Sequence, residues 1–200
     1  EYNTISGCYT LHAGSQSVHR QKAEMASIFD VPLNDVRVIA GDVGGGYGPR
    51  MSMYPEFVLV VWAAKRLERP IKWTSTRAEA FISDHQARDQ ASRSALAFDA
   101  EGHILAMRCG ILYNVGAMTA AFVSMANGTR LVTSLYDIPL LHLEAKAVLS
   151  HTVPTAPYRG AGRPEAIYNI ERLLDTAAEE MAIDRVEIRR RNLIPHDAIP

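Results

Sequence analysis

The amino-acid sequence predicts an α+β fold in which mixed sheets pack against helices. Its 200 residues are 48% hydrophobic and 22% charged, with a formal net charge of −1, which is the composition of a globular chain with a sizeable core. Segments with helical periodicity and segments rich in β-branched residues follow one another without regular βαβ alternation, and no internal repeat is evident. This mixed order favours an α+β architecture over a doubly wound sheet.

The N-terminal part of the chain predicts two helices and two strands. In residues 16–29 the apolar and small side chains recur mostly at helical spacing. Residues 35–43 are rich in β-branched side chains and predict a strand that runs directly into three glycines. Pro55 suits the first turn of a second helix at 56–67, whose nearly continuous apolar character implies burial. A second strand is predicted at 70–74.

The C-terminal part predicts a hairpin, a further strand and two helices. Residues 94–98 and 104–113 are extended runs, and Asp-Ala-Glu-Gly at 99–102 supplies the turn between them. Another strand follows at 143–149. The two helices are predicted at 166–181 and 186–193, the second with Asp184 as its N-cap.

Charge and cysteine content argue against several classes of function. Binding to a nucleic-acid backbone requires a clustered excess of Lys and Arg, and this chain is nearly neutral, so we expect no nucleic-acid partner. The densest basic cluster, residues 189–191, is interpreted as a solvated helix end. Cys8 and Cys109 lie far apart without CxxC spacing, so we expect neither a zinc site nor an iron–sulfur cluster in this chain.

The two ends of the chain and its longest apolar runs bear on where in the cell the protein is expected. No apolar run reaches the length of a membrane span and no signal peptide opens the chain, so we expect a cytoplasmic protein without a membrane partner. Because the chain begins at Glu1 without methionine and stops abruptly at Pro200, we interpret it as a piece of a longer protein.

The sequence DVGGGYGPR, residues 42–50, is the first candidate binding loop. Consecutive glycines cost conformational entropy and expose main-chain N–H groups, so we expect a ligand against this backbone. A dinucleotide-binding turn requires GxGxxG, but Gly44 and Gly46 are followed by Pro49 at the third place, and the Gly-Lys-Ser/Thr of a P-loop is missing. The alternative to a binding loop is a plain tight turn.

The sequence APYRGAGRPE is the second candidate loop. Arg159 and Arg163 bracket Gly160 and Gly162, and Pro164 opens a helix whose N-terminus carries partial positive charge. Arginine supplies forked donors, and glycine lets main-chain N–H groups approach a ligand. The two loops together predict a site for an anion or an oxygen-rich cofactor.

A family resemblance rests on five motifs in order: GGGYGPR, YDIP, PYRGAGRPE, ERLLDTAAEEMAID and RRRNLI. Together they resemble the molybdenum-binding large subunit of the xanthine dehydrogenase, aldehyde oxidase and carbon monoxide dehydrogenase family. The likeness runs nearly end to end, which implies that residues 1–200 are part of the molybdopterin-binding region of a longer large subunit.

The resemblance also implies an activity. Members of this family of molybdenum hydroxylases oxidise aldehydes or N-heterocycles, take oxygen from water, and pass two electrons to iron–sulfur clusters and FAD on partner subunits or domains. We therefore expect a small-molecule substrate and a molybdopterin cofactor with molybdenum, in the cytosine dinucleotide form if the source is bacterial.

Residues of the first loop carry over position by position. Gln16 matches the family glutamine that hydrogen-bonds an oxygen ligand of molybdenum; without the resemblance it would be interpreted as a surface helix residue. Tyr47 stands where the family usually has phenylalanine beside the metal. Gly45, Gly46 and Gly48 match the glycines that bring the chain close to the cofactor.

Residues of the second loop carry over in the same way. Arg159 matches the arginine of the substrate-side loop, where it would orient a carbonyl or an oxygen that develops negative charge. The alternative role for Arg159 is a salt bridge that holds the loop. Gly160 and Ala161 are expected to line the cofactor.

Departures from the family pattern bear on the metal site, the substrate and the catalytic base. Copper-containing carbon monoxide dehydrogenases have cysteine at the position of Gly160, so we expect no copper–molybdenum site. Xanthine-oxidising members have glutamate at the position of Met51 and phenylalanine at that of Ala161, so an aldehyde or another small heteroaromatic substrate fits better than xanthine. The family's catalytic glutamate lies in a VGE-type motif, and this chain has only VGA at 115–117.

Without a positioned base, the isolated chain is expected to be inactive, because general-base assistance typically contributes about 100-fold to 10,000-fold. Three alternatives stay open. The chain could be one subunit of a split enzyme that receives the glutamate from a partner, a non-catalytic module that docks the cofactor, or a plain structural domain.

Overall fold

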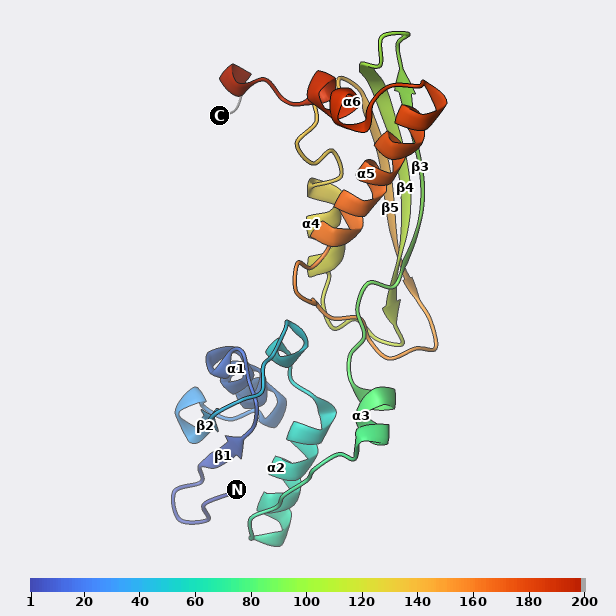
Figure 1. Ribbon diagram of the computed structural model, residues 1–200. Helices are drawn as coiled ribbons and strands as arrows, with labels where there is room; N and C mark the ends of the chain where they lie inside the picture. Colours follow the sequence, from blue (N-terminus) through green and yellow to red (C-terminus); the bar gives the residue numbers. More distant parts are fainter. Residues whose placement is uncertain (199–200) are drawn as a thin grey trace. The chain divides into compact units, whose positions relative to one another are not determined.

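The computed structural model describes residues 1–198 and divides the chain into two compact units, Glu1–Asp84 and His85–Pro200 (Figure 1). Each unit combines helices with its own small sheet, so the predicted α+β fold with mixed sheets and packed helices is confirmed. Within the described residues, no helix combines the length and the apolar character needed to cross a bilayer.

The first unit is a two-stranded parallel sheet packed against helices. Strand β1 (Tyr9–His12) pairs residue for residue with β2 (Val36–Ile39). Helix α1 (Val18–Phe29) connects the strands, and it shares one core with the sheet and with α2 (Pro55–Leu67). The buried members of this core are Tyr9, Leu11, Met25, Ala26, Val36 and Val61. Helix α3 (Arg77–Ser83) and two 3-10 turns, η1 (Leu33–Asp35) and η2 (Pro49–Met51), complete the unit.

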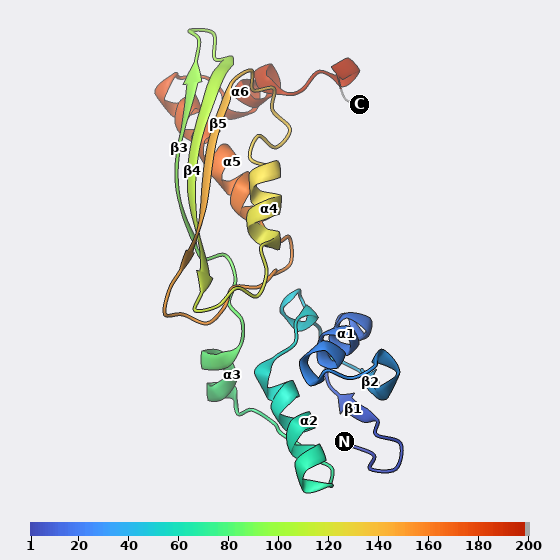
Figure 2. The same ribbon diagram turned by 180° about the vertical axis from the view of Figure 1, so that it is seen from behind.

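The second unit is a three-stranded mixed sheet with helices on one face. Its strands β3 (Gln90–Phe98), β4 (Ile104–Gly116) and β5 (Leu141–Leu149) lie in that order, with β3 antiparallel and β5 parallel to β4. Helices α4 (Val123–Arg130) and α5 (Arg163–Glu180) cover the same face of this sheet (Figure 1, Figure 2). Helix α6 (Arg185–Asn192) and the turn η3 (His196–Ala198) follow.

Helix α5 forms because its apolar side chains fall on one face. Ile170 and Leu174 are fully buried in the core of the second unit, together with Met107, Cys109 and Ile111 of β4. The side chains of β4 alternate between this core and the opposite face, as expected for a strand with one covered side. Full burial of one such aliphatic side chain stabilises the fold by about 1.5–3 kcal/mol.

The basic cluster at 189–191 is not uniformly solvated, and the interpretation of it as a solvated helix end is wrong for its first member. Arg189 donates to Glu171 Oε2 and to Asp175 Oδ1, each at 2.8 Å, and thereby joins α6 to α5. The side chain of Arg190, by contrast, is 72% exposed. The sequence showed the basic cluster but not the acidic partners on the neighbouring helix.

Several element boundaries differ from the sequence-based predictions. The predicted helices and the hairpin are all present with shifted ends, whereas the strand predicted at 35–43 ends at Ile39. The strand predicted at 70–74 is wrong, because these residues have no strand beside them to pair with. The sequence analysis missed β1, α3 and α4, although Thr76 and Glu79 form a capping box that signals the start of α3.

Candidate functional site

The predicted site residues divide between the two units. Gln16 and residues 45–48 belong to the first unit, whereas residues 159–161 belong to the second. Each set has its own geometry.

In the first unit, the structure brings Gln16 against the glycine loop. Gln16 Oε1 accepts a hydrogen bond from the main-chain N–H of Gly48 at 2.7 Å, and Gln16 N donates to Arg50 O at 3.1 Å. Because an N–H can face only the oxygen of the amide, this contact fixes the orientation of the Gln16 amide. Its NH2 group is turned away from Gly48, and no acceptor for it is recorded among residues 1–198. It can donate to an external oxygen.

Gly46 is required by close packing. A Cβ atom at this position would overlap the side chain of Gln16, so the glutamine can lie across the loop only because residue 46 has no side chain. The neighbouring Tyr47 adopts a left-handed conformation, with φ 52°, and the residue is 52% exposed. Such a conformation is costly for a tyrosine and is typical of functional loops.

Arg50, the arginine of the first loop, has a structural role. Arg50 Nη2 lies 2.6 Å from Asp84 Oδ2, and its guanidinium lies 5.0 Å from the ring centroid of Tyr54. The hydroxyl of Tyr54 donates to the other oxygen of Asp84 at 2.6 Å. These contacts join the end of the glycine loop to the ends of α2 and α3. Arg50 therefore stabilises the position of the loop.

In the second unit, the main-chain carbonyl groups of the loop at 158–162 already accept hydrogen bonds from other groups of the chain. Residues 160–162 all have positive φ, at 95°, 35° and 90°. Asn127 Nδ2 donates to Ala161 O at 3.0 Å, and Arg163 N donates to Gly160 O at 3.1 Å. The N–H group of Gly160, which is exposed, has no acceptor in the described chain, whereas Gly162 is buried against α4. An exposed, unsatisfied N–H group in a loop with satisfied carbonyls is suited to an anionic or oxygen-rich ligand.

Arg88 is a residue of this site that the sequence analysis missed. Its Nη2 donates to the main-chain oxygen of Arg159 at 2.6 Å, and its guanidinium lies 5.1 Å from the ring centroid of Tyr158. Its Nη1 lies 3.4 Å from Glu165 Oε2, whose side chain is only 8% exposed. Arg88 thus fixes the backbone of Arg159 while the side chain of Arg159 stays exposed. No local motif signals this contact, because the two residues are 71 positions apart.

The helix that follows the loop begins at a close crossing with α4. A Cβ atom on Gly162, the N-cap of α5, would lie 2.6 Å from Gly128 N and would overlap Ser124 O. Beside this crossing, the hydroxyl of Tyr113 is buried and has no hydrogen-bond partner within the described chain. Burial is the main cause that raises the pKa of Tyr113 to about 12, with smaller contributions from Glu165 and Cys109. The hydroxyl is therefore protonated at neutral pH.

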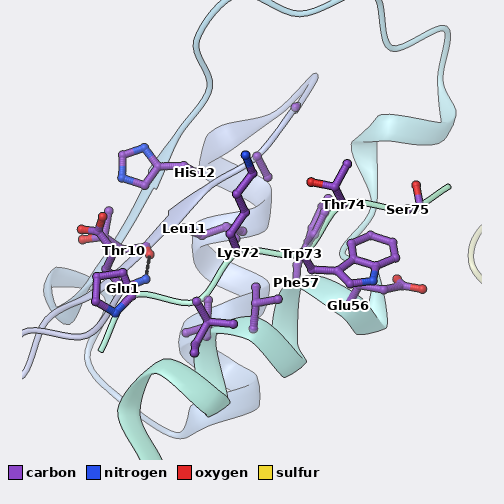
Figure 3. A pocket seen from close by; sticks show the side chains of 16 residues that line it. Glu1, Thr10, Leu11, His12, Glu56, Phe57, Lys72, Trp73, Thr74 and Ser75 are labelled. Carbon is purple, nitrogen blue, oxygen red and sulfur yellow. Dashed lines mark hydrogen bonds between the residues drawn. The ribbon is translucent and has the colours of Figure 1, made fainter. Parts of the chain in front are cut away.

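A pocket of about 650 Å³ lies in the first unit, and no predicted site residue lines it (Figure 3). Its walls are residues 10–14, residues 70–75 and the start of α2. Among the residues that the structure describes, no group of three or more His, Cys, Asp or Glu side chains could hold a metal ion.

Comparison with known proteins gives a consistent result. The family model of the molybdopterin cofactor-binding domain matches residues 1–193. The gamma subunit of the 6-hydroxypseudooxynicotine dehydrogenase complex of Paenarthrobacter nicotinovorans is 33% identical over 94% of this chain and 24% of its own length. The carbon monoxide dehydrogenase large chain of Hydrogenophaga pseudoflava is 32% identical over 100% of this chain and 25% of its own.

A solved structure agrees with these matches. Quinoline 2-oxidoreductase from Pseudomonas putida 86 superimposes with a TM-score of 0.95 at 28% identity, over 100% of this chain and 26% of that chain. The chain thus spans about a quarter of the length of the relatives that it matches.

Proposed function

The chain belongs to the molybdopterin cofactor-binding domain family, and from this premise we propose that it contributes cofactor and substrate contacts to a complete molybdenum hydroxylase large subunit. That subunit oxidises an aldehyde or an N-heterocycle with water as the oxygen source. The observation that carries the proposal is the hydrogen bond from Gly48 to Gln16, because it leaves an oriented amide donor beside an exposed glycine backbone.

The first unit fits a cofactor rich in oxygen atoms. The NH2 group of Gln16 donates to one of its oxygen atoms, and Gly45 and Gly46, which have no side chains, let the ring of Tyr47 and the side chain of Gln16 lie close to the loop that contacts it. Tyr47 and Gly48 complete this edge of the loop. The bound molybdopterin supplies the two-electron redox chemistry, which no side chain of this chain can perform.

Arg159 orients the substrate. Its side chain is exposed while its main-chain oxygen is held by Arg88, so the guanidinium starts from a fixed backbone. A guanidinium directed at a carbonyl oxygen binds more strongly as negative charge develops there. Gly160 and Ala161 present main-chain atoms to the cofactor from the same loop. The exposure of Arg159 argues against the alternative that it only holds the loop in a salt bridge.

Three positions support the proposed substrate class. Gly160 has φ 95°, and a Cβ atom there would lie 2.9 Å from the ring of Pro164, so a cysteine as in copper-containing carbon monoxide dehydrogenases would be strained. Met51 and Ala161 offer neither the acid nor the ring expected for xanthine. The names of two similar proteins refer to 6-hydroxypseudooxynicotine and to quinoline, which supports an N-heterocycle.

We assign the catalytic base and the electron-transfer groups to polypeptide outside this chain. Val115 and Gly116 of the VGA sequence end strand β4, and the chain carries no VGE sequence there, so we assign the catalytic base to another part of the large subunit or to a partner polypeptide. The iron–sulfur clusters and FAD belong to partner subunits, the pterin is the cytosine dinucleotide form if the source is bacterial, and the location is the cytoplasm. Residues 1–200 alone are inactive.

The test is Arg159→Ala in the complete enzyme. A substrate-orienting role predicts a large loss of kcat/KM with unchanged molybdenum and pterin content. If the variant loses molybdenum instead, the second loop docks the cofactor, which is the alternative function. If neither rate nor metal content changes, the assignment of Arg159 is wrong.

A further inference from the structure

Asn127 of α4 is a polar residue inside a short helix. Asparagine is a poor helix former, because its short side chain competes with the main chain for hydrogen bonds, and α4 has only eight residues. The partner of Asn127 lies outside the helix: its Nδ2 donates to the main-chain oxygen of Ala161 at 3.0 Å, 34 positions later in the chain. This hydrogen bond therefore stabilises the second loop and not the helix that carries Asn127.

The residue after Asn127 fixes its position. Gly128 is buried, and a Cβ atom on Gly162, the residue after Ala161, would lie 2.6 Å from the main-chain nitrogen of Gly128. Helices α4 and α5 lie side by side at this crossing (Figure 1, Figure 2). Because the main chains at 127–128 and 161–162 are in direct contact, the amide of Asn127 has little freedom to move away from Ala161 O.

Ala161 closes the turn that carries Arg159. Its N–H donates to Tyr158 O at 2.6 Å, which leaves Arg159 and Gly160 at the two central positions of a β-turn. Gly160 has φ 95°, near the value of about +80° that a type II turn requires at its third residue. Together with the hydrogen bond from Asn127, this bond engages both main-chain groups of Ala161.

The conformation of Ala161 requires such anchoring. Its φ of 35° lies in the left-handed region, which is unfavourable for alanine because the Cβ atom is crowded there. A residue in this region persists only where the surrounding structure over-determines it. If Ala161 returned to a negative φ, the bond that closes the turn would be lost, and Arg159 would point in another direction.

We propose that Asn127 is a positioning residue, which holds Ala161 in its left-handed conformation and thereby sets the direction in which the turn presents Arg159. Asn127 acts at the end of the turn, while Arg88 holds the main-chain oxygen of Arg159. The effect on turnover rests on the proposed role of Arg159 in orienting the substrate, and it requires no contact between Asn127 and the substrate.

Asn127→Ala in the complete enzyme tests the proposal. Alanine is the better helix former, so the substitution removes the donor without weakening α4. We expect kcat/KM to fall by about 10- to 100-fold with unchanged molybdenum content, because small displacements of a positioning group are costly. Thr129→Ala is the matched control, since its hydroxyl bonds only within α4, to Met125 O and Ala126 O, and it should leave kcat/KM unchanged.

A second substitution separates positioning of Ala161 from a general effect on the α4–α5 crossing. Glycine adopts positive φ without crowding, so Ala161→Gly makes the left-handed conformation less dependent on Asn127. In the Ala161→Gly background, Asn127→Ala should therefore cost clearly less in kcat/KM than in the wild type. Equal losses in the two backgrounds would overturn the proposal.

Arg159→Ala, measured in parallel, separates this proposal from the proposed function. If Arg159→Ala slows the enzyme and Asn127→Ala does not, Asn127 is not a positioning residue and the proposed function stands. If Arg159→Ala keeps the wild-type rate, the proposed function fails, and an experimental structure of the Asn127→Ala enzyme decides the role of Asn127. A changed φ at Ala161 would support that role, and an unchanged loop would overturn it.

Discussion

Gln16 Oε1 lies 2.7 Å from the main-chain nitrogen of Gly48, and this contact turns the amide NH2 of Gln16 away from the loop. The two halves of the amide thus have separate tasks: the oxygen holds the glycine loop, and the nitrogen remains available to a ligand.

Gln16→Glu separates these tasks. The carboxylate can still accept from Gly48, but it cannot donate, so we expect the thermal stability of the complete enzyme to be retained while kcat falls by about 10- to 100-fold. Gln16→Ala removes both functions and should also lower the free energy of unfolding by about 1 kcal/mol. Equal kcat for wild type and Gln16→Glu would show that the donor is not used.

Arg88 should affect turnover through Arg159. Arg88→Met removes the hydrogen bond to Arg159 O, and because small displacements of a positioning group are costly, we expect kcat/KM to fall by about 10- to 100-fold. Arg88→Lys should restore part of the loss, and Arg93→Met, on an exposed position of β3, should have little effect.

The double variant Arg88→Met with Arg159→Ala gives the decisive measurement of kcat/KM. If Arg88 acts only by positioning Arg159, the double variant should be no slower than Arg159→Ala alone. Additive losses in kcat/KM would contradict the positioning role.

The crossing of α4 and α5 should tolerate no side chain at Gly162. Gly162→Ala introduces a Cβ atom into the main chain of α4 at a residue with φ 90°, so we expect a loss of more than about 3 kcal/mol in the free energy of unfolding. Gly110→Ala is the matched control, because the nearest atom to its new Cβ is 3.8 Å away. Denaturant unfolding measures both; similar midpoints for the two variants would disprove the close crossing.

The link between α5 and α6 should weaken in acid. The hydrogen bond from Arg189 is the main cause that lowers the pKa of Asp175 below its ordinary value of 3.8. A carboxyl with a lowered pKa stabilises the fold fully above its unfolded pKa, and this stabilisation is lost as pH falls through the folded pKa. The Tm difference between wild type and Arg189→Leu should therefore be largest above about pH 5 and shrink below about pH 4. Arg190→Leu, whose parent side chain is 72% exposed and contributes less than Arg191 to the lowered pKa of Glu187, should show a much smaller pH dependence.

Local periodicity was sufficient to predict the elements that are marked in the sequence by regular apolar spacing or by turn residues. Helix α5 and the β3–β4 hairpin were found because apolar spacing and turn residues mark them directly. The strand predicted at 70–74 did not form although its side chains favour one, because a strand requires a neighbour, and none lies beside it in the described chain.

The candidate site was predictable in its glycines and arginines but not in its contacts. The orientation of Gln16 depends on a residue 32 positions later, and the role of Arg88 depends on one 71 positions away. Arg50, the arginine of the first loop, is paired with Asp84. Only tertiary structure separates a supporting arginine from one that is exposed to a ligand.

The central claim is that the first unit contacts the cofactor through Gln16 and the glycine loop. An experimental structure of the complete large subunit with its cofactor bound tests this most directly. We expect Gln16 Nε2 at about 3 Å from a cofactor oxygen, with the main chain at Gly45 and Gly46 in contact with the same group. A cofactor bound beyond hydrogen-bonding distance of Gln16, with another part of the subunit between it and the loop, would contradict the account.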